Sequence, residues 1–359
     1  MTVLYVLLAV LLLAILIVVH ELGHFSAARL MKIEVREFSV GFGPKLLGCK
    51  SRKHETDFSL RAIPLGGFCA FYGEDDPTGE SKDDPRALAK QSVWKRMFVI
   101  LMGPVMNFVL AFVVAAGFYM IGGVQTVTGL DPYIVSVTAS GPAHDAGMKD
   151  GDIITAVNGN DVLDGTMDTL IGMIDAWHEG DDPLDLTVQR GDETLQMELT
   201  PFFDEEEKKM RIGVMIGGRY RTETVRVSPA EAIAESWRYC VYAGGAIFEA
   251  LGNLVTKGEG LDQTSGPVGV ISLVTEQVRE NGLEMYIQLL VVISINLGIM
   301  NLLPIPGLDG SRLIFGLIEV IRGKPIPPEK EAIVHLCGML LLFGLMIFFT
   351  FKDIIRLFN

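Results

Sequence analysis

The stretch MTVLYVLLAVLLLAILIVVHELGH, residues 1–24, decides both the fold and the chemistry of this chain. Its first 19 residues carry no charged side chain, and about 20 apolar residues are enough to cross a bilayer as one helix. His20 and His24 then stand four residues apart, on one face of the same helix, where they can share a metal ion. Glu21 follows the first of them, within reach of a metal-bound water. The stretch therefore predicts a metal site on a membrane helix.

Hydrophobic residues make up 49% of the chain and gather in four stretches that are long enough to span a membrane. These stretches are roughly 2–22, 97–121, 285–303 and 332–351. A secretory signal is the alternative interpretation of residues 1–19, but no Lys or Arg precedes the apolar run and the His-Glu pattern follows it directly. We therefore predict a polytopic α-helical membrane protein with about four transmembrane helices.

Basic residues orient the predicted spans. No Lys or Arg precedes the first span, whereas the loop after it is rich in both, so that loop is expected on the cytoplasmic side. Four spans then place residues 122–284 outside the cytoplasm. Residues 1–122 form the first half of the membrane core, and 285–359 form the second half.

The cytoplasmic loop, residues 32–72, does not have the pattern of a helix. Lys32–Val40 and His54–Ala62 alternate between apolar and polar residues and are bounded by Gly and Pro, which predicts a membrane-associated β-hairpin region. It forms either a small sheet with no direct role or an edge strand that receives an extended peptide.

Residues 133–162, YIVSVTASGPAHDAGMKDGDIITAVNGNDV, resemble a PDZ domain of the kind associated with bacterial proteases. The resemblance implies an extracytoplasmic α+β domain over residues 123–220. PDZ domains bind peptide ends by adding a strand to a sheet edge, and the loop near Tyr133 and Ile134 is the candidate carboxylate site. A PDZ fold that binds no peptide and acts as a steric filter is the alternative.

Residues 221–284 predict an amphipathic helical linker. Ser228-Pro229-Ala230-Glu231 has the form of a capping box and opens a helix that runs to about Lys257. Polar residues along this helix favour a position on the outer membrane surface over a fifth span.

A catalytic zinc ion usually has three protein ligands and a water, so His20 and His24 need a third partner. The candidate is Asp309 in NLLPIPGLDG, residues 301–310, at the end of the third predicted span. A carboxylate at membrane depth is costly unless it is paired or bound to metal, although an interfacial turn is the alternative. The first and third spans run in the same direction, so both deliver these residues to the cytoplasmic end of the membrane.

Three motifs together resemble the site-2 protease family, of the bacterial RseP and RasP type. His20–His24 match its H-E-x-x-H pattern, residues 301–310 match N-x-x-P-x-P-x-L-D-G, and Gly103–Asn107 match G-P-x-x-N. The resemblance covers essentially the whole chain. This chain carries one PDZ domain, whereas the enterobacterial members have two. The way in which paired PDZ domains filter substrates therefore does not carry over to this chain.

The resemblance implies a zinc-dependent intramembrane endopeptidase in the inner membrane of a bacterium, with its active site near the cytoplasmic side. One Zn²⁺ per chain would be held by His20, His24 and Asp309, with Glu21 as general base. Single-span membrane proteins, such as anti-sigma factors or remnant signal peptides, would be its substrates.

Asn301, Pro304 and Asn107 are the candidate substrate contacts in the membrane, although a buried packing role is the alternative for Asn107. The rival function is a non-enzymatic zinc-binding scaffold or transporter-like protein with a peptide-binding PDZ module. Glu21 argues against it, because a purely structural zinc site does not need that carboxylate. The net charge of −14 argues against a nucleic-acid partner.

Overall fold

The computed structural model describes residues 2–51, 55–73, 84, 86–163, 167–205, 208–260 and 264–358. The chain forms two compact units: unit 1 is Met1–Ile121 with Ser228–Asn359, and unit 2 is Gly122–Val227. Unit 2 is an insertion in the membrane core, and it extends beyond the predicted 123–220. The extension arises because strands β3 (Val124–Val137) and β10 (Val214–Val225) pair along their whole length, as far as Val124 and Val225.

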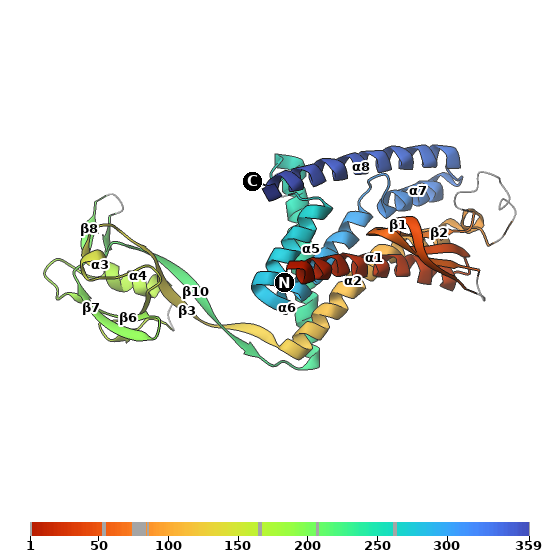
Figure 1. Cartoon of the computed structure of the whole chain (residues 1–359). Coiled ribbons are helices and arrows are strands. Elements are labelled where there is room, and N and C mark those ends of the chain that lie inside the picture. The colour runs from red at the N-terminus through yellow and green to blue at the C-terminus, as the bar shows by residue number, and fades with distance from the viewer. Residues whose placement is uncertain are drawn as a thin grey trace. The chain divides into compact units, whose positions relative to one another are not determined.

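Four helices of unit 1 are long and apolar enough to cross a membrane (Figure 1), which confirms the four predicted apolar segments. They are α1 (Thr2–Leu30), α2 (Val93–Gly122), α6 (Pro267–Leu302) and α8 (Pro328–Phe358). The His-Glu pattern continues α1 without a break, because nothing in residues 20–30 interrupts the helix.

Helix α6 is the centre of unit 1. Ala9, Leu12 and Leu16 of α1 pack against one part of it, and Ala111 and Ala115 of α2 pack against another. Small residues let membrane helices approach closely, so both α1 and α2 pack against α6. The backbone of α6 leaves helical geometry at Gly282, where two helical segments meet at a kink.

Helix α5 (Pro229–Lys257) begins as predicted. The Ser228 hydroxyl accepts a hydrogen bond from the Glu231 amide at 3.3 Å, and the Glu231 carboxylate accepts one from the Ser228 amide at 2.8 Å. The second bond lowers the pKa of Glu231. This capping box fixes where the polypeptide re-enters unit 1 after the insertion.

Helix α7 (Asp309–Arg322) lies between α6 and α8 in the sequence. An ion pair holds it to the start of α2, where Arg96 Nη2 lies 2.6 Å from both carboxylate oxygens of Glu319. Asp309 is therefore the first residue of a helix, and not part of a turn.

The predicted hairpin region is a long antiparallel pair, β1 (Val35–Lys50) and β2 (Asp57–Phe71). Both strands bend, so that residues 35–40 lie between 57–60 and 67–71 of β2. Residues 67–71 pair only with 35–40 in the described part of the chain, which makes them an edge of this curved sheet. This sheet packs against α1.

Unit 2 contains a sheet with strand order β10-β3-β4-β6-β7 and two short helices. Its apolar core includes Ile134, Ile154, Leu170, Leu186 and Val188, all fully buried. The other elements are α3 (Pro142–Asp145), β4 (Ile153–Val157), β5 (Asn160–Asp161), α4 (Met167–Asp175), β6 (Leu184–Arg190), β7 (Glu193–Leu199), β8 (Phe202–Asp204) and β9 (Lys209–Arg211).

The candidate carboxylate site of unit 2 was predicted in the loop near Tyr133 and Ile134. Both residues lie inside strand β3, and the Ile134 side chain is fully buried. The Ile134 amide donates to the Asp152 carbonyl at 2.7 Å, and its carbonyl accepts from the Gly151 amide at 2.7 Å. Because both backbone groups of Ile134 are already bonded, this residue has no free amide for a peptide carboxylate.

Candidate active site

Two imidazoles from α1 and one carboxylate from α7 meet at a single point in unit 1. His20 Nε2 lies 3.2 Å from His24 Nε2, and Asp309 Oδ2 lies 3.1 Å and 3.3 Å from these two atoms. Both histidines are buried. The three residues form the one group of at least three His, Cys, Asp or Glu side chains with metal-binding geometry among the described residues.

These distances fit a tetrahedral zinc ion. Zn–N and Zn–O bonds of about 2.0–2.1 Å at tetrahedral angles place neighbouring ligand atoms about 3.3 Å apart. The buried Asp309 Oδ2 has no hydrogen-bond partner among the described residues, so a cation would satisfy it. Two nitrogens and one oxygen are also a donor set that zinc accepts, and they leave a fourth position for water or substrate.

His24 is fixed from behind by α2. Its Nδ1 lies 3.0 Å from the Val99 carbonyl, which can only accept a hydrogen bond. Nδ1 therefore carries the ring proton and Nε2 presents a lone pair towards Asp309. Gly103 provides the space for this ring, because a Cβ at that position would lie 2.3 Å from His24 Nε2. The glycine of the Gly103–Asn107 motif is thus required by the position of a ligand histidine.

His20 also contacts α2, through Asn107. Asn107 Nδ2 lies 3.2 Å from His20 Nδ1, and the Asn107 side chain is fully buried. Asn107 is fully inaccessible and its amide is directed at a ligand histidine, which favours the alternative of a buried packing role, and its contact with substrate stays a prediction.

Asp309 reaches the site because α6 ends early. The helix stops at Leu302, and Pro304 and Pro306 prevent it from continuing. Asp309 then opens α7, where the positive end of the helix dipole favours a negative charge. The intervening loop is held by α8, because the Gly307 amide donates to His335 Nδ1 at 3.3 Å.

Glu21 stands on the side of the site that faces the β1–β2 sheet. Its carboxylate accepts a hydrogen bond from the Cys69 amide in the edge segment of β2. The approach is close at Gly67, where a Cβ would lie 2.9 Å from the Ser39 carbonyl and 3.2 Å from Glu21 Cγ. The edge of the sheet is therefore in direct contact with the candidate general base.

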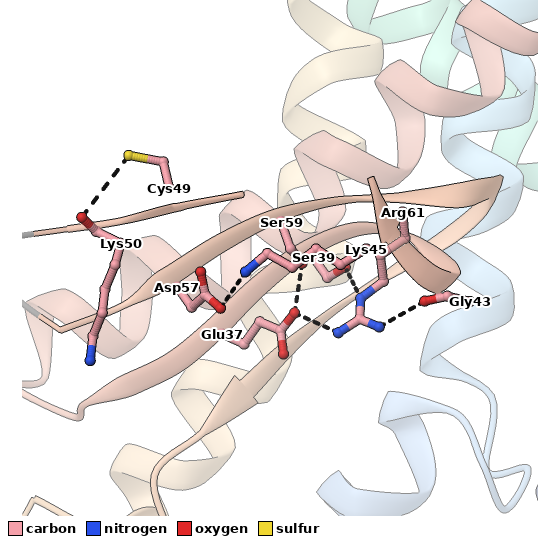
Figure 2. A network of polar contacts seen from close by, with 9 residues as sticks. All are labelled: Glu37, Ser39, Gly43, Lys45, Cys49, Lys50, Asp57, Ser59 and Arg61. Carbon is pink, nitrogen blue, oxygen red and sulfur yellow. Dashed lines mark hydrogen bonds and ion pairs between the residues drawn. The ribbon is translucent and has the colours of Figure 1, made fainter. Parts of the chain in front are cut away.

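A polar network holds this sheet in its bent form (Figure 2). Arg61 donates to Ser39 Oγ at 3.0 Å, to the Gly43 carbonyl at 2.8 Å and to Glu37 Oε1 at 2.7 Å. Ser59 also donates to Glu37 Oε1, at 2.6 Å. Burial raises the pKa of Glu37, but the hydrogen bonds from Ser59 and Arg61 outweigh it and leave that pKa below its ordinary value. The network joins the two strands of the sheet.

The remaining predicted substrate contacts lie at the break after α6. Asn301 is half-buried in the last turn of that helix, and Pro304 is exposed in the loop that follows. Both stand within eight residues of Asp309 along the chain, and their contact with substrate stays a prediction.

Several residues that support the site were missed in the sequence. His335 and the Val99 carbonyl make hydrogen bonds across helices that no local pattern announces. The Arg96–Glu319 pair joins residues 223 positions apart. Arg96 was recognisable as a charged residue at the end of an apolar stretch, but the sequence did not identify Glu319 as its partner.

Comparisons with known proteins agree with this geometry. The model of peptidase family M50 matches residues 8–345. The chain is 34% identical to the regulator of sigma-W protease RasP of Bacillus subtilis, over 96% of each chain. It is 32% identical to the zinc metalloprotease RasP of Geobacillus kaustophilus, again over 96% of each.

One solved structure matches part of the chain. It is the PDZ domain of an SdrC-like protein from Listeria monocytogenes, at 25% identity and a TM-score of 0.22, and the match covers 24% of this chain and 85% of that domain. A score this low assigns no fold.

The family match extends from α1 into α8 and includes all three residues of the metal-binding group. The chain therefore belongs to peptidase family M50 and is a zinc metalloprotease.

Proposed function

We propose that this protease hydrolyses peptide bonds within or near the transmembrane segments of single-span membrane proteins, using one zinc ion held by His20, His24 and Asp309. The observation that carries the proposal is the convergence of these three ligand atoms, 3.1–3.3 Å apart, on helices that are apolar enough to lie in a membrane or that adjoin one. The alternative of a non-enzymatic zinc scaffold is not favoured, because relatives that match the whole chain are proteases.

A zinc ion at this site would polarise the peptide carbonyl and lower the pKa of a water molecule. Glu21 would take the proton of that water and deliver it to the leaving amine. The Cys69 amide donates a hydrogen bond to the Glu21 carboxylate, which supports an ordered position for this base. His24 and Asp309 are themselves held by α2 and by the start of α7, which keeps the ligand atoms in place throughout the reaction.

The substrate needs hydrogen-bond partners once its helix unwinds. A transmembrane helix buries its carbonyls in its own backbone bonds, and an extended segment in lipid must replace them. Among the described residues, segment 67–71 of β2 pairs with β1 as its one neighbouring strand, and it adjoins Glu21. We infer that the substrate adds a strand there, with Asn301 and Pro304 on the opposite side of the cleavage site.

Unit 2 is proposed to be an extracytoplasmic PDZ domain that receives peptide ends at a sheet edge. Tyr133 and Ile134 belong to an inner strand, so the candidate edge becomes β10, which pairs only with β3 in the described chain. Anti-sigma factors and remnant signal peptides are the proposed substrates, and the first class is supported by the similar protein of Bacillus subtilis, whose name is regulator of sigma-W protease RasP. The inner membrane of a bacterium is the proposed location, with the site near the cytoplasmic side.

The decisive experiment is Glu21→Gln, which removes the base and leaves the zinc ligands untouched. We expect the variant to keep one zinc per chain and to lose cleavage of a co-expressed single-span substrate. Survival of cleavage would contradict the role of Glu21, and loss of zinc would show that Glu21 is itself a ligand.

A further inference from the structure

Asn107 is the buried polar side chain closest to the metal-binding group that has no role in the proposed reaction. It lies in α2, inside an apolar helix, and is fully buried. Its Nδ2 is 3.2 Å from His20 Nδ1, and its Oδ1 is buried without a hydrogen-bond partner among the described residues. A buried carbonyl oxygen without a donor costs about 1–3 kcal/mol, so an amide is unfavourable at this position unless its oxygen accepts a hydrogen bond.

The chemistry of His20 identifies a donor for this oxygen. A neutral imidazole that presents the Nε2 lone pair to a metal carries its proton on Nδ1, and that proton needs an acceptor. Nε2 of His20 is the atom that faces Asp309 and His24, so Nδ1 must be the donor. The side chain within hydrogen-bonding distance of this Nδ1 is Asn107.

A half-turn of the Asn107 carboxamide about its Cβ–Cγ bond exchanges Oδ1 and Nδ2. The exchange brings the unpartnered oxygen to the Nδ1–H of His20 and gives it a donor. We propose that Asn107 is a positioning residue that holds His20 in its metal-binding tautomer through a hydrogen bond from Nδ1 to Oδ1. This inference rests on the proposed zinc-binding role of His20.

The backbone carbonyl of Asn107 also has a hydrogen-bond partner. Ser294 of α6 donates a hydrogen bond to the Asn107 carbonyl at 2.7 Å, and both residues are fully buried. His24 has a matching arrangement, in which the Val99 carbonyl of α2 accepts a hydrogen bond from Nδ1. Helix α2 therefore serves both ligand histidines, His24 through a backbone carbonyl and His20 through a side-chain carbonyl.

The test compares zinc affinity in the purified full-length chain by competition with a chelator. Asn107→Leu keeps the volume and removes the acceptor, and we expect it to weaken zinc binding by about 10–100-fold. Asn107→Asp keeps an acceptor oxygen at the same place, and we expect its zinc affinity to stay close to that of the wild type.

Ser294→Ala is the matched control for packing. It removes the bond that holds the Asn107 backbone but leaves the side chain beside His20, and we expect unchanged zinc affinity. Wild-type affinity in Asn107→Leu would overturn the inference, and so would equal losses in all three variants, which would indicate a packing role. If the wild-type chain binds no zinc at His20, the proposed metal site itself fails, together with this inference. Normal zinc binding by the wild type with an unaffected Asn107→Leu refutes the inference alone.

Discussion

Replacement of Gly103 by alanine should impair metal binding without unfolding the chain. A Cβ there would lie 2.3 Å from His24 Nε2, 2.4 Å from Cε1 and 2.9 Å from Cδ2, whereas ordinary contacts begin at 3.4 Å. The imidazole is rigid and is held on its other side by the Val99 carbonyl, so the whole ring must move by about 1 Å. Metal–ligand distances tolerate only about 0.2 Å. We therefore expect Gly103→Ala to lose most of its zinc.

The matched control for this prediction is Gly117→Ala on the same helix. A Cβ at Gly117 would have nothing within 4 Å, and alanine favours a helix over glycine by about 1 kcal/mol. We expect Gly117→Ala to keep one zinc per chain and to be at least as stable as the wild type. Zinc content is measured in the purified proteins by plasma emission, and helix content by circular dichroism. Full zinc occupancy in Gly103→Ala would refute the reasoning, because the ring would then have another way to reach the metal.

Three further predictions follow from the same contacts. Asp309→Asn should lower the zinc content without lowering the helix content, since the amide replaces the charged ligand at the same place; an unchanged metal stoichiometry would contradict the role of Asp309 as a ligand. Gly67→Ala should retain zinc but lower the rate of substrate cleavage, because its Cβ would push the sheet edge away from Glu21; a wild-type rate would show that this edge can move freely. Arg190→Met should destabilise unit 2 by about 3 kcal/mol, because Asp152 is only 1% exposed and both of its oxygens accept from Arg190 at 2.7 Å; limited proteolysis of the full chain measures this, and wild-type resistance would contradict it.

The same ion pair gives unit 2 a dependence on pH. Burial raises the pKa of Asp152, but the hydrogen bonds from Arg190 and from the Lys149 amide outweigh it and hold that pKa below its ordinary value of 3.8. A carboxyl whose pKa is lower in the folded state stabilises the fold fully above the ordinary pKa, and this contribution is lost as the pH falls through the folded value. Proteolytic resistance of unit 2 should therefore be constant above about pH 5 and decline below pH 3.8, with a smaller decline in Asp152→Asn.

The sequence predicted the parts of the fold that depend on local chemistry. Long apolar runs identified four helices, and the capping box at Ser228 identified the start of α5, because both depend on neighbouring residues alone. The sequence also predicted that His20 and His24 lie near Asp309, because the first and third spans run in the same direction and bring the two segments to one end of the membrane. The structure places these three residues together as predicted.

What could not be predicted depends on contacts between distant elements. Asn107 was recognisable as a polar residue in an apolar helix, but only the packing of α2 against α1 shows that His20 is its partner. Helix α7 was missed because its amphipathic sequence is short and lies between two prolines and a charged connection. The position of Tyr133 inside the sheet, opposite Gly217 and Ile153, could not be predicted, because strand register is set by pairing and not by the sequence of one strand.

The central claim is that one zinc ion is bound by His20, His24 and Asp309. X-ray absorption at the zinc edge of the purified chain tests it directly. The claim predicts one zinc per chain with nitrogen and oxygen neighbours at about 2.0–2.1 Å, two of them imidazoles, and one fewer oxygen neighbour from protein in Asp309→Asn. A chain without zinc, or a zinc ion with sulfur neighbours at about 2.3 Å, would contradict it.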